Sequence, residues 1–275
     1  MTYCRHCGAE LEENAKFCSK CGTPVAMQPI AGKEPISRKR SSMNPWMIAG
    51  IAVLAIVVLA AIVAIPLLLG GLFPFTRVVG SGNLRTQEEA LSDFSIVDVD
   101  SGFKVNITQA SSFSISITAD DNMFDYIQVT KIGNTLSVGL ESGVSFQTSV
   151  LKTEITMPDL EELQFSGGVN GNATGFVMSH DFRADLSGGS ILRMEGEANN
   201  ITAICSGGSR LELSGFAVNN ANIDFSGGSQ GTINLDGVLN ADLSGGSRLF
   251  YIGNPTLGDI NTSGGSNISP FGFQQ

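Results

Sequence analysis

The chain has 275 residues, a length that suits one large domain or two small ones. Residues 77–275 hold nine Lys/Arg against 22 Asp/Glu. A domain this acidic repels nucleic acid, which excludes a general DNA- or RNA-binding role. Glycines number 33 and aromatic residues make up only 7% of the chain, a composition that favours short strands and tight turns over helices.

The first 26 residues carry a cysteine pattern typical of a zinc site. Cys4, Cys7, Cys18 and Cys21 form two C-x2-C pairs that are ten residues apart. Two intervening residues let both sulfurs of a pair face one ion, and a second pair completes a tetrahedron around Zn²⁺. We therefore predict one structural zinc per chain in a zinc ribbon over residues 1–26, with no ligand position open for catalysis. A dithiol redox pair is the alternative.

This stretch resembles the short zinc-ribbon modules found near the termini of many prokaryotic membrane proteins. The resemblance implies a structural site and a docking surface for a cytoplasmic protein partner.

A basic linker is expected over residues 27–44 and a transmembrane helix over residues 45–71. No charged residue occurs between Ser41 and Thr76, and about 20 apolar residues suffice to cross the hydrocarbon core. A cleaved signal peptide fits less well, because the apolar run is long and a metal-binding module precedes it.

The charges that flank this segment predict its orientation. Lys33, Arg38, Lys39 and Arg40 precede it, so the positive-inside rule places the N-terminus in the cytoplasm and the large C-terminal domain outside. Reduced thiolates that hold zinc agree with a cytosolic N-terminus. We therefore expect a single-pass cell-membrane protein.

A Ser-Gly-Gly phrase recurs through the large domain. Its serines are Ser166, Ser187, Ser206, Ser226, Ser244 and Ser263, at intervals of 18 to 21 residues. Self-similarity at such a period is typical of a solenoid. The glycines permit a corner that a Cβ would obstruct, and we expect one glycine of each pair to be irreplaceable.

The residues before each corner alternate between apolar and polar. Apolar side chains stand three residues before each serine, at Leu163, Ala184, Ala203, Ile223, Ala241 and Ile260. A period of two indicates a strand with one buried face. Each coil is therefore predicted to read strand, corner, strand, turn. Residues 84–160 also alternate, and we expect them to form a first, capping set of coils.

The segments FSIVDVDSGFKVNIT and ITADDNMFDYIQVTKIGNTLSVGL, followed by the D-x-SGGS ladder, resemble the head GIN domain of putative auto-transporter adhesins. The first repeat, QFSGGVNG, departs from the pattern, and Ile204 replaces the aspartate in the third. The resemblance implies a right-handed, single-stranded β-solenoid. We place it over residues 88–271, after a linker over 72–87, which makes the chain mainly β.

Asp185, Asp224 and Asp242 are the obvious candidates for chemistry. Some solenoids are polysaccharide lyases or hydrolases with carboxylates in a groove. Here the aspartates recur with a structural repeat, so side-chain bonding to the corner backbone is the simpler interpretation, and a calcium site is a third. We interpret Cys205 as a small core residue and His180 as a loop residue.

The sequence therefore favours a non-catalytic, membrane-anchored cell-envelope protein. Its solenoid would bind a surface glycan, another polymer or a protein, as long solenoid faces do. One alternative is a transmembrane signalling or scaffold protein that uses the zinc ribbon as a cytoplasmic docking module. A polysaccharide-active enzyme is a second.

Overall fold

The computed structural model describes residues 2–3, 6–7, 9–11, 17–21, 76–147 and 150–272. It divides the chain into two compact units, Met1–Gly70 and Gly71–Gln275. The expected basic linker and the expected membrane span at 45–71 lie outside the described residues. Within the described ranges, no helix is long and apolar enough to cross a membrane.

The first unit contains one short antiparallel pair, β1 (Thr2–Tyr3) and β2 (Glu10–Leu11). The two strands flank the first C-x2-C step in the sequence, so the chain reverses direction between β1 and β2.

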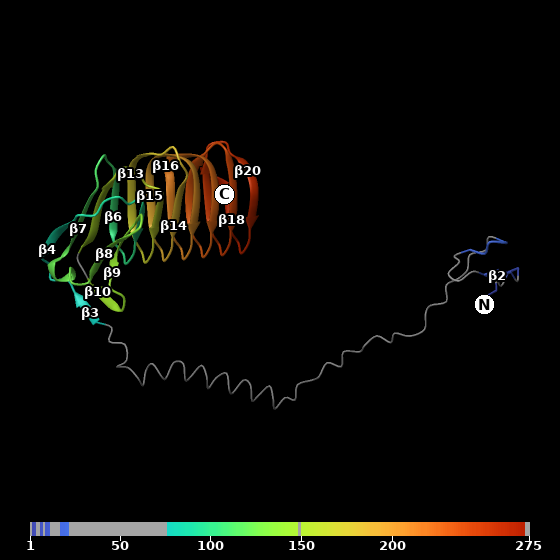
Figure 1. Cartoon of the computed structure of the whole chain (residues 1–275), viewed down its shortest axis with the longest axis horizontal. Coiled ribbons are helices and arrows are strands. Elements are labelled where there is room, and N and C mark those ends of the chain that lie inside the picture. The colour runs from blue at the N-terminus through green and yellow to red at the C-terminus, as the bar shows by residue number, and fades with distance from the viewer. Residues whose placement is uncertain are drawn as a thin grey trace, which may run out of the picture. The chain divides into compact units, whose positions relative to one another are not determined.

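The second unit is almost entirely β and is built around a parallel stack (Figure 1). The strands of the regular part are β12 (Glu162–Phe165), β13 (Asn170–Val177), β14 (Phe182–Leu186), β15 (Ile191–Cys205), β16 (Arg210–Phe225), β17 (Gln230–Leu235), β18 (Val238–Leu243), β19 (Arg248–Ile252), β20 (Thr256–Thr262) and β21 (Asn267–Pro270). All pairings among them are parallel. This is the stacking of a β-solenoid, in which each coil lies on the one before it.

The register confirms the predicted repeat through five of its six inward positions, whereas Ile260 in the last coil pairs with Ala241 but is only partly buried. Leu163 pairs with Ala184, which pairs in turn with Ala203, and the ladder continues through Ile223 and Ala241. All five side chains are buried. The next inward ladder runs Phe165, Leu186, Cys205, Phe225 and Leu243, and it is fully buried as well. One coil could not bury these side chains alone, so the stack and the core form together.

The Ser-Gly-Gly steps are the corners between the two strands of each coil. Both glycines of each pair have positive φ, for example 63° at Gly207 and 80° at Gly208, whereas only one was expected to be irreplaceable. A Cβ on Gly207 would lie 3.1 Å from the backbone nitrogen of Gly188 in the preceding coil, while one on Gly208 would meet nothing within 4 Å. The first glycine is thus constrained twice, by its dihedral angle and by coil contact.

Before the regular part, residues 76–147 and 150–157 form nine strands and a short 3-10 helix, η1 (Asp121–Met123). The strands are β3 (Thr76–Val79), β4 (Leu84–Glu89), β5 (Ile96–Val99), β6 (Lys104–Gln109), β7 (Ser114–Asp120), β8 (Ile127–Ile132), β9 (Thr135–Leu140), β10 (Val144–Gln147) and β11 (Leu151–Met157). β5 and β6 pair in parallel with β12 and β13, so they form one further coil of the stack.

The rest of this region is only in part the set of coils that we expected: β9 and β11 pair in parallel with β5 and β6, but the other strands depart from the stack. β7 is antiparallel to both β4 and β11, and β8 forms an antiparallel hairpin with β9. The two residues between β8 and β9 are Gly133 and Asn134, and Gly133 has a φ of 59°. A glycine with positive φ at the first position of a two-residue loop favours a hairpin. The region therefore caps the end of the stack near β4 to β9 (Figure 1).

Residues 72–87, expected to be a linker, contribute β3 and most of β4 to this cap. β3 pairs in parallel with β10, and β4 pairs with β7. The fully buried carboxylate of Asp120 accepts a 2.8 Å hydrogen bond from the backbone N–H of Gly82, between the two strands. The folded unit therefore begins earlier in the chain than the alternation alone suggested.

Candidate functional site

Three of the four predicted zinc ligands lie together in the first unit. The sulfurs of Cys7, Cys18 and Cys21 all lie within 4.8 Å of one another, and those of Cys7 and Cys18 are 3.6 Å apart. A disulfide would need about 2.05 Å, whereas zinc–sulfur bonds of about 2.3 Å in a tetrahedron separate sulfurs by about 3.8 Å. The spacing therefore fits thiolates around one zinc ion. Cys4 lies outside the described residues.

The surroundings of Cys18 favour a thiolate. Backbone hydrogen bonds from Lys20 and Cys21 lower the pKa of the Cys18 thiol. Backbone N–H groups that point at a ligand sulfur also orient it, as outer-shell partners do in metal sites. The geometry and the donor set thus both suit zinc.

The predicted aspartates form a ladder on the outer face of the strands that precede the corners. Asp185 pairs with Ile204, Ile204 with Asp224, and Asp224 with Asp242. Only Asp224 and Asp242 are therefore direct neighbours, and Asp185 instead lies 3.5 Å from the guanidinium of Arg183. No aspartate of this ladder bonds the corner backbone among the contacts of the described residues.

A shallow depression of about 370 Å³ runs along this face. Its polar lining comes from four coils: Thr202, Asn222, Asp224, Asn240, Asp242, Asp259 and Asn261. The Asn240 amide donates a 2.9 Å hydrogen bond to Asn222 and its oxygen accepts one of 3.0 Å from the Asp259 N–H. The face is therefore a row of amides and carboxylates at strand spacing.

These carboxylates do not converge as calcium ligands would. In the part of the chain that the structure describes, the cysteine trio is the one group of three or more His, Cys, Asp or Glu side chains close enough to share an ion. The calcium interpretation thus gains no support from the geometry.

One further carboxylate on this outer face, that of Asp98, was missed in the sequence analysis. Asp98 pairs with Gln164, which pairs with Asp185, so a further carboxylate lies on this face two coils before Asp185. Burial raises the pKa of Asp98, the nearby charge of Asp100 raises it further, and a hydrogen bond with Ser137 lowers it. The corner after Asp98 has the sequence Asp-Ser-Gly in place of Ser-Gly-Gly, so a search for the repeated phrase does not find this coil. The pairing of Val99 with Phe165 reveals that this segment is a coil of the stack.

Cys205 is a core residue, as predicted. It is fully buried in the ladder between Leu186 and Phe225. Burial raises the pKa of its thiol, so it lacks the thiolate character that a nucleophile needs.

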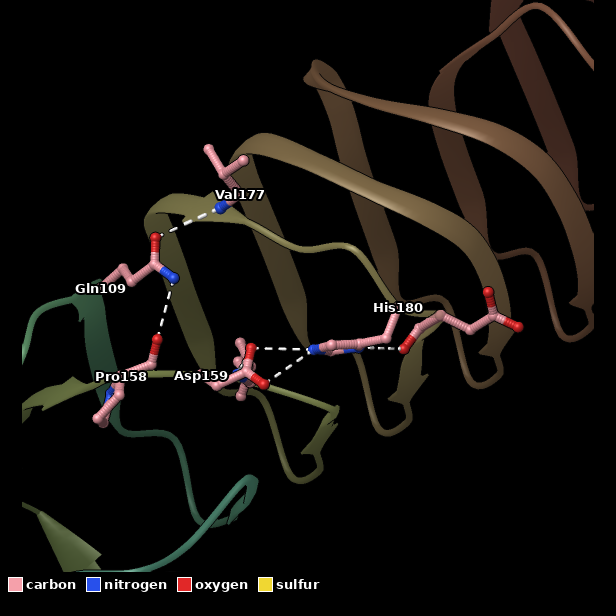
Figure 2. A network of polar contacts seen from close by, with 7 residues as sticks. Gln109, Pro158, Asp159, Val177 and His180 are labelled. Carbon is pink, nitrogen blue, oxygen red and sulfur yellow. Dashed lines mark hydrogen bonds and ion pairs between the residues drawn. The ribbon is translucent and has the colours of Figure 1, made fainter.

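His180 lies in the loop between β13 and β14, as predicted, and it joins two loops of the domain (Figure 2). Its Nε2 lies 2.9 Å and 3.0 Å from the two carboxylate oxygens of Asp159, and its Nδ1 lies 2.8 Å from the Asp181 carbonyl oxygen. The Asp181 carbonyl and then Asp159 raise the pKa of His180.

Gln109 extends this network along the surface. Its amide donates to the Pro158 carbonyl at 2.9 Å and accepts a hydrogen bond from the Val177 N–H at 3.4 Å (Figure 2). These contacts join the loop after β11 to the end of β13 through Gln109 at the end of β6, and nothing in them resembles a nucleophile with its base. We interpret the network as a clamp between the cap and the solenoid.

Comparison with known proteins agrees with this architecture. Residues 93–255 match the family described as "Putative auto-transporter adhesin, head GIN domain", and residues 3–25 match a zinc-ribbon domain. The first match covers more than half of the chain, so the chain belongs to that family. No curated protein matches the chain in sequence.

Solved structures show the same fold. A putative adhesin from Bacteroides fragilis matches with a TM-score of 0.57 at 20% identity, over 70% of this chain and 98% of that one. A protein from Parabacteroides distasonis, titled a putative lipid binding protein, matches with a TM-score of 0.50 at 18% identity, over 70% of this chain and 100% of that one. At these identities the likeness concerns the fold alone.

Proposed function

We propose that this chain is a single-pass, membrane-anchored cell-envelope protein whose β-solenoid binds a surface polymer or a surface protein without catalysis. One observation carries the proposal: outward side chains repeat in register from coil to coil, which produces a long face of repeated chemistry. Such a face suits a repetitive or extended ligand. We also expect the coil to be right-handed, because parallel crossover connections nearly always are.

The family supports a binding role. Its description names an adhesin head, and the two solved relatives carry titles of adhesion and lipid binding. The non-catalytic part of the proposal rests on the ladder itself, since Asp224 and Asp242 are two members of a structural repeat and Asp185 is paired with Arg183.

Residues 45–71 would anchor the protein, with the N-terminus in the cytoplasm. The support is the uncharged apolar run and the basic residues that precede it. Protease added to intact cells, or to protoplasts, should remove the solenoid and spare the zinc ribbon. Protection of the solenoid would reverse the orientation.

The first unit would hold one zinc ion through Cys4, Cys7, Cys18 and Cys21. Zinc supplies folding energy to such small modules. The cysteine cluster also favours a second candidate function, a signalling or scaffold protein whose ribbon docks a cytoplasmic partner. Pull-down with the zinc-loaded chain, compared with Cys18→Ser, would reveal such a partner.

The binding function itself is tested by displaying the full chain in nanodiscs. These are presented to a glycan array and to envelope proteins from the same cells. Saturable retention of either class supports the proposal, whereas turnover of a polysaccharide would replace it with the enzyme alternative.

A further inference from the structure

The face that follows the corners differs in chemistry from the acidic face that precedes them. Its outward ladder runs Arg210, Gln230 and Arg248, and the neighbouring ladder runs Glu212, Thr232 and Phe250. Three of the few basic residues of the domain therefore gather here once Arg193, which pairs with Glu212, is included. Coil stacking thus separates an acidic face from one with arginines and an aromatic ring.

A second groove, of about 360 Å³, lies on this face. The polar and aromatic side chains that line it are Arg210, Glu212, Ser214, Gln230, Thr232, Phe250 and Phe271. Thr232 is a short residue between Glu212 and Phe250 in the register. Its small side chain between two larger ones leaves the surface hollow at this point.

Two phenylalanines form one side of the groove. The rings of Phe250 and Phe271 lie 6.4 Å apart between centroids and nearly perpendicular, at 87°. Phe271 is 60% exposed, and its backbone N–H is held by the Tyr251 carbonyl at 2.8 Å. A single exposed phenylalanine would need no explanation, but here two rings border a hollow that also carries polar groups.

The polar groups of the groove are held in position by ion pairs. The Glu212 carboxylate lies 2.7 Å from the guanidinium of Arg193 through one oxygen and 3.8 Å from that of Arg210 through the other. The side chains of all three are between 33% and 50% exposed. A guanidinium has five N–H donors, so Arg210, which lines the groove, keeps donors for a ligand while the Glu212 charge is balanced.

We propose that this groove binds a pyranose ring of a surface polysaccharide, an inference that rests on the binding function proposed above. The C–H face of a pyranose is apolar and can pack on a phenylalanine ring, while its hydroxyls need donors and acceptors fixed in direction. Phe271 supplies the ring, and Arg210, Gln230 and Glu212 supply donors and acceptors. The hollow has the size of a small-molecule pocket.

The test uses the full chain in nanodiscs and three soluble probes, titrated by calorimetry. The probes are hexasaccharides of β-1,4-glucose, of β-1,4-N-acetylglucosamine and of α-1,4-galacturonic acid. Saturable binding of at least one is expected, with Phe271→Ala and Arg210→Gln each weakening it at least tenfold. Ile132→Ala, which changes an 80% exposed apolar side chain on β8 in the cap, is the matched control and should leave binding unchanged. An unchanged melting temperature shows that each variant is folded.

The outcomes separate the groove from the wider function. If the galacturonate probe alone binds, and high salt abolishes its binding, the ligand is an acidic sugar. If a glucose or N-acetylglucosamine probe binds and salt has no effect, the ligand is a neutral sugar. Binding that Phe271→Ala and Arg210→Gln leave intact overturns the groove but keeps the proposed function. If no hexasaccharide binds while a surface protein is retained and released by Phe271→Ala, the occupant is a protein and the sugar assignment is wrong.

Discussion

The hydroxyl of Ser209 donates a 2.7 Å hydrogen bond to the carbonyl oxygen of Ser206 across the corner between two strands. Ser209 is fully buried. The same bond occurs from Ser190 to Ser187, from Ser229 to Ser226 and from Ser247 to Ser244. The last serine of the SGGS phrase therefore closes these four corners with the same hydrogen bond.

Ser209→Ala should lower the free energy of unfolding by about 1 kcal/mol, since it removes one buried hydrogen bond. The Ser206 carbonyl keeps the backbone bond from Ser209 N–H, which limits the loss. Ser206→Ala is the control and should change stability by about 0.5 kcal/mol or less, as for ordinary surface positions. Denaturant unfolding measures both, and a larger loss for Ser206→Ala would contradict this assignment.

The two glycines of a corner should respond differently to substitution. Gly208→Val puts a β-branched residue at a φ of 80° in open space and should cost about 1–2 kcal/mol from backbone strain. Gly207→Val adds contact with the Gly188 backbone and should cost about 3 kcal/mol or more.

Gly208→Asn provides the control for this pair. Asparagine tolerates left-handed φ, so its melting temperature should stay nearest to that of the unchanged chain. Equal melting temperatures for Gly207→Val and Gly208→Val would mean that coil contact is unimportant at the corner.

Stability should depend on pH through His180. Its folded-state pKa is raised, so its pairing with Asp159 stabilises the fold fully below the unfolded pKa of about 6.5. The contribution is lost as pH rises through the folded value. The melting temperature of the unchanged chain should exceed that of His180→Gln by more at pH 6 than at pH 8.5.

The contribution of this pair to stability is small, because solvent screens it. The side chain of His180 is 35% exposed and that of Asp159 is 52% exposed. The Asp181 carbonyl, which is the largest cause, and the charge of Glu161 also raise the pKa of His180, so Asp159→Asn should reduce the pH dependence without abolishing it. If the difference in melting temperature between the unchanged chain and His180→Gln is constant with pH, the charged His180–Asp159 pair does not contribute to stability.

Metal removal should affect only the first unit. The purified chain should contain one zinc per molecule, and Cys18→Ser should lose it, because a closed site needs all four thiolates. Cys205→Ala is the matched cysteine control and should retain full zinc content. Circular dichroism of the β-solenoid should be the same with and without chelator, and zinc retained by Cys18→Ser would contradict the ligand set.

Much of the regular solenoid could be predicted from the sequence. The spacing of Ser187, Ser206 and Ser226 encodes the coil length, and the alternation around Ala203 and Cys205 encodes which side chains are buried. Both are local patterns repeated along the chain, so they can be recognised without knowing which segments touch. The same is true of the C-x2-C spacing of the predicted zinc ligands.

The antiparallel cap, the strands at 76–89 and the groove beside Phe271 were decided only by the tertiary structure. Alternation indicates that residues 114–120 form a strand, but it does not choose β4 and β11 as its partners. Likewise, Arg210, Thr232 and Phe250 are about twenty residues apart and become neighbours only because the coils stack in one register. A local pattern specifies which face of a strand is buried, whereas strand pairing is selected by contacts between distant segments, and every candidate site on this solenoid depends on those contacts.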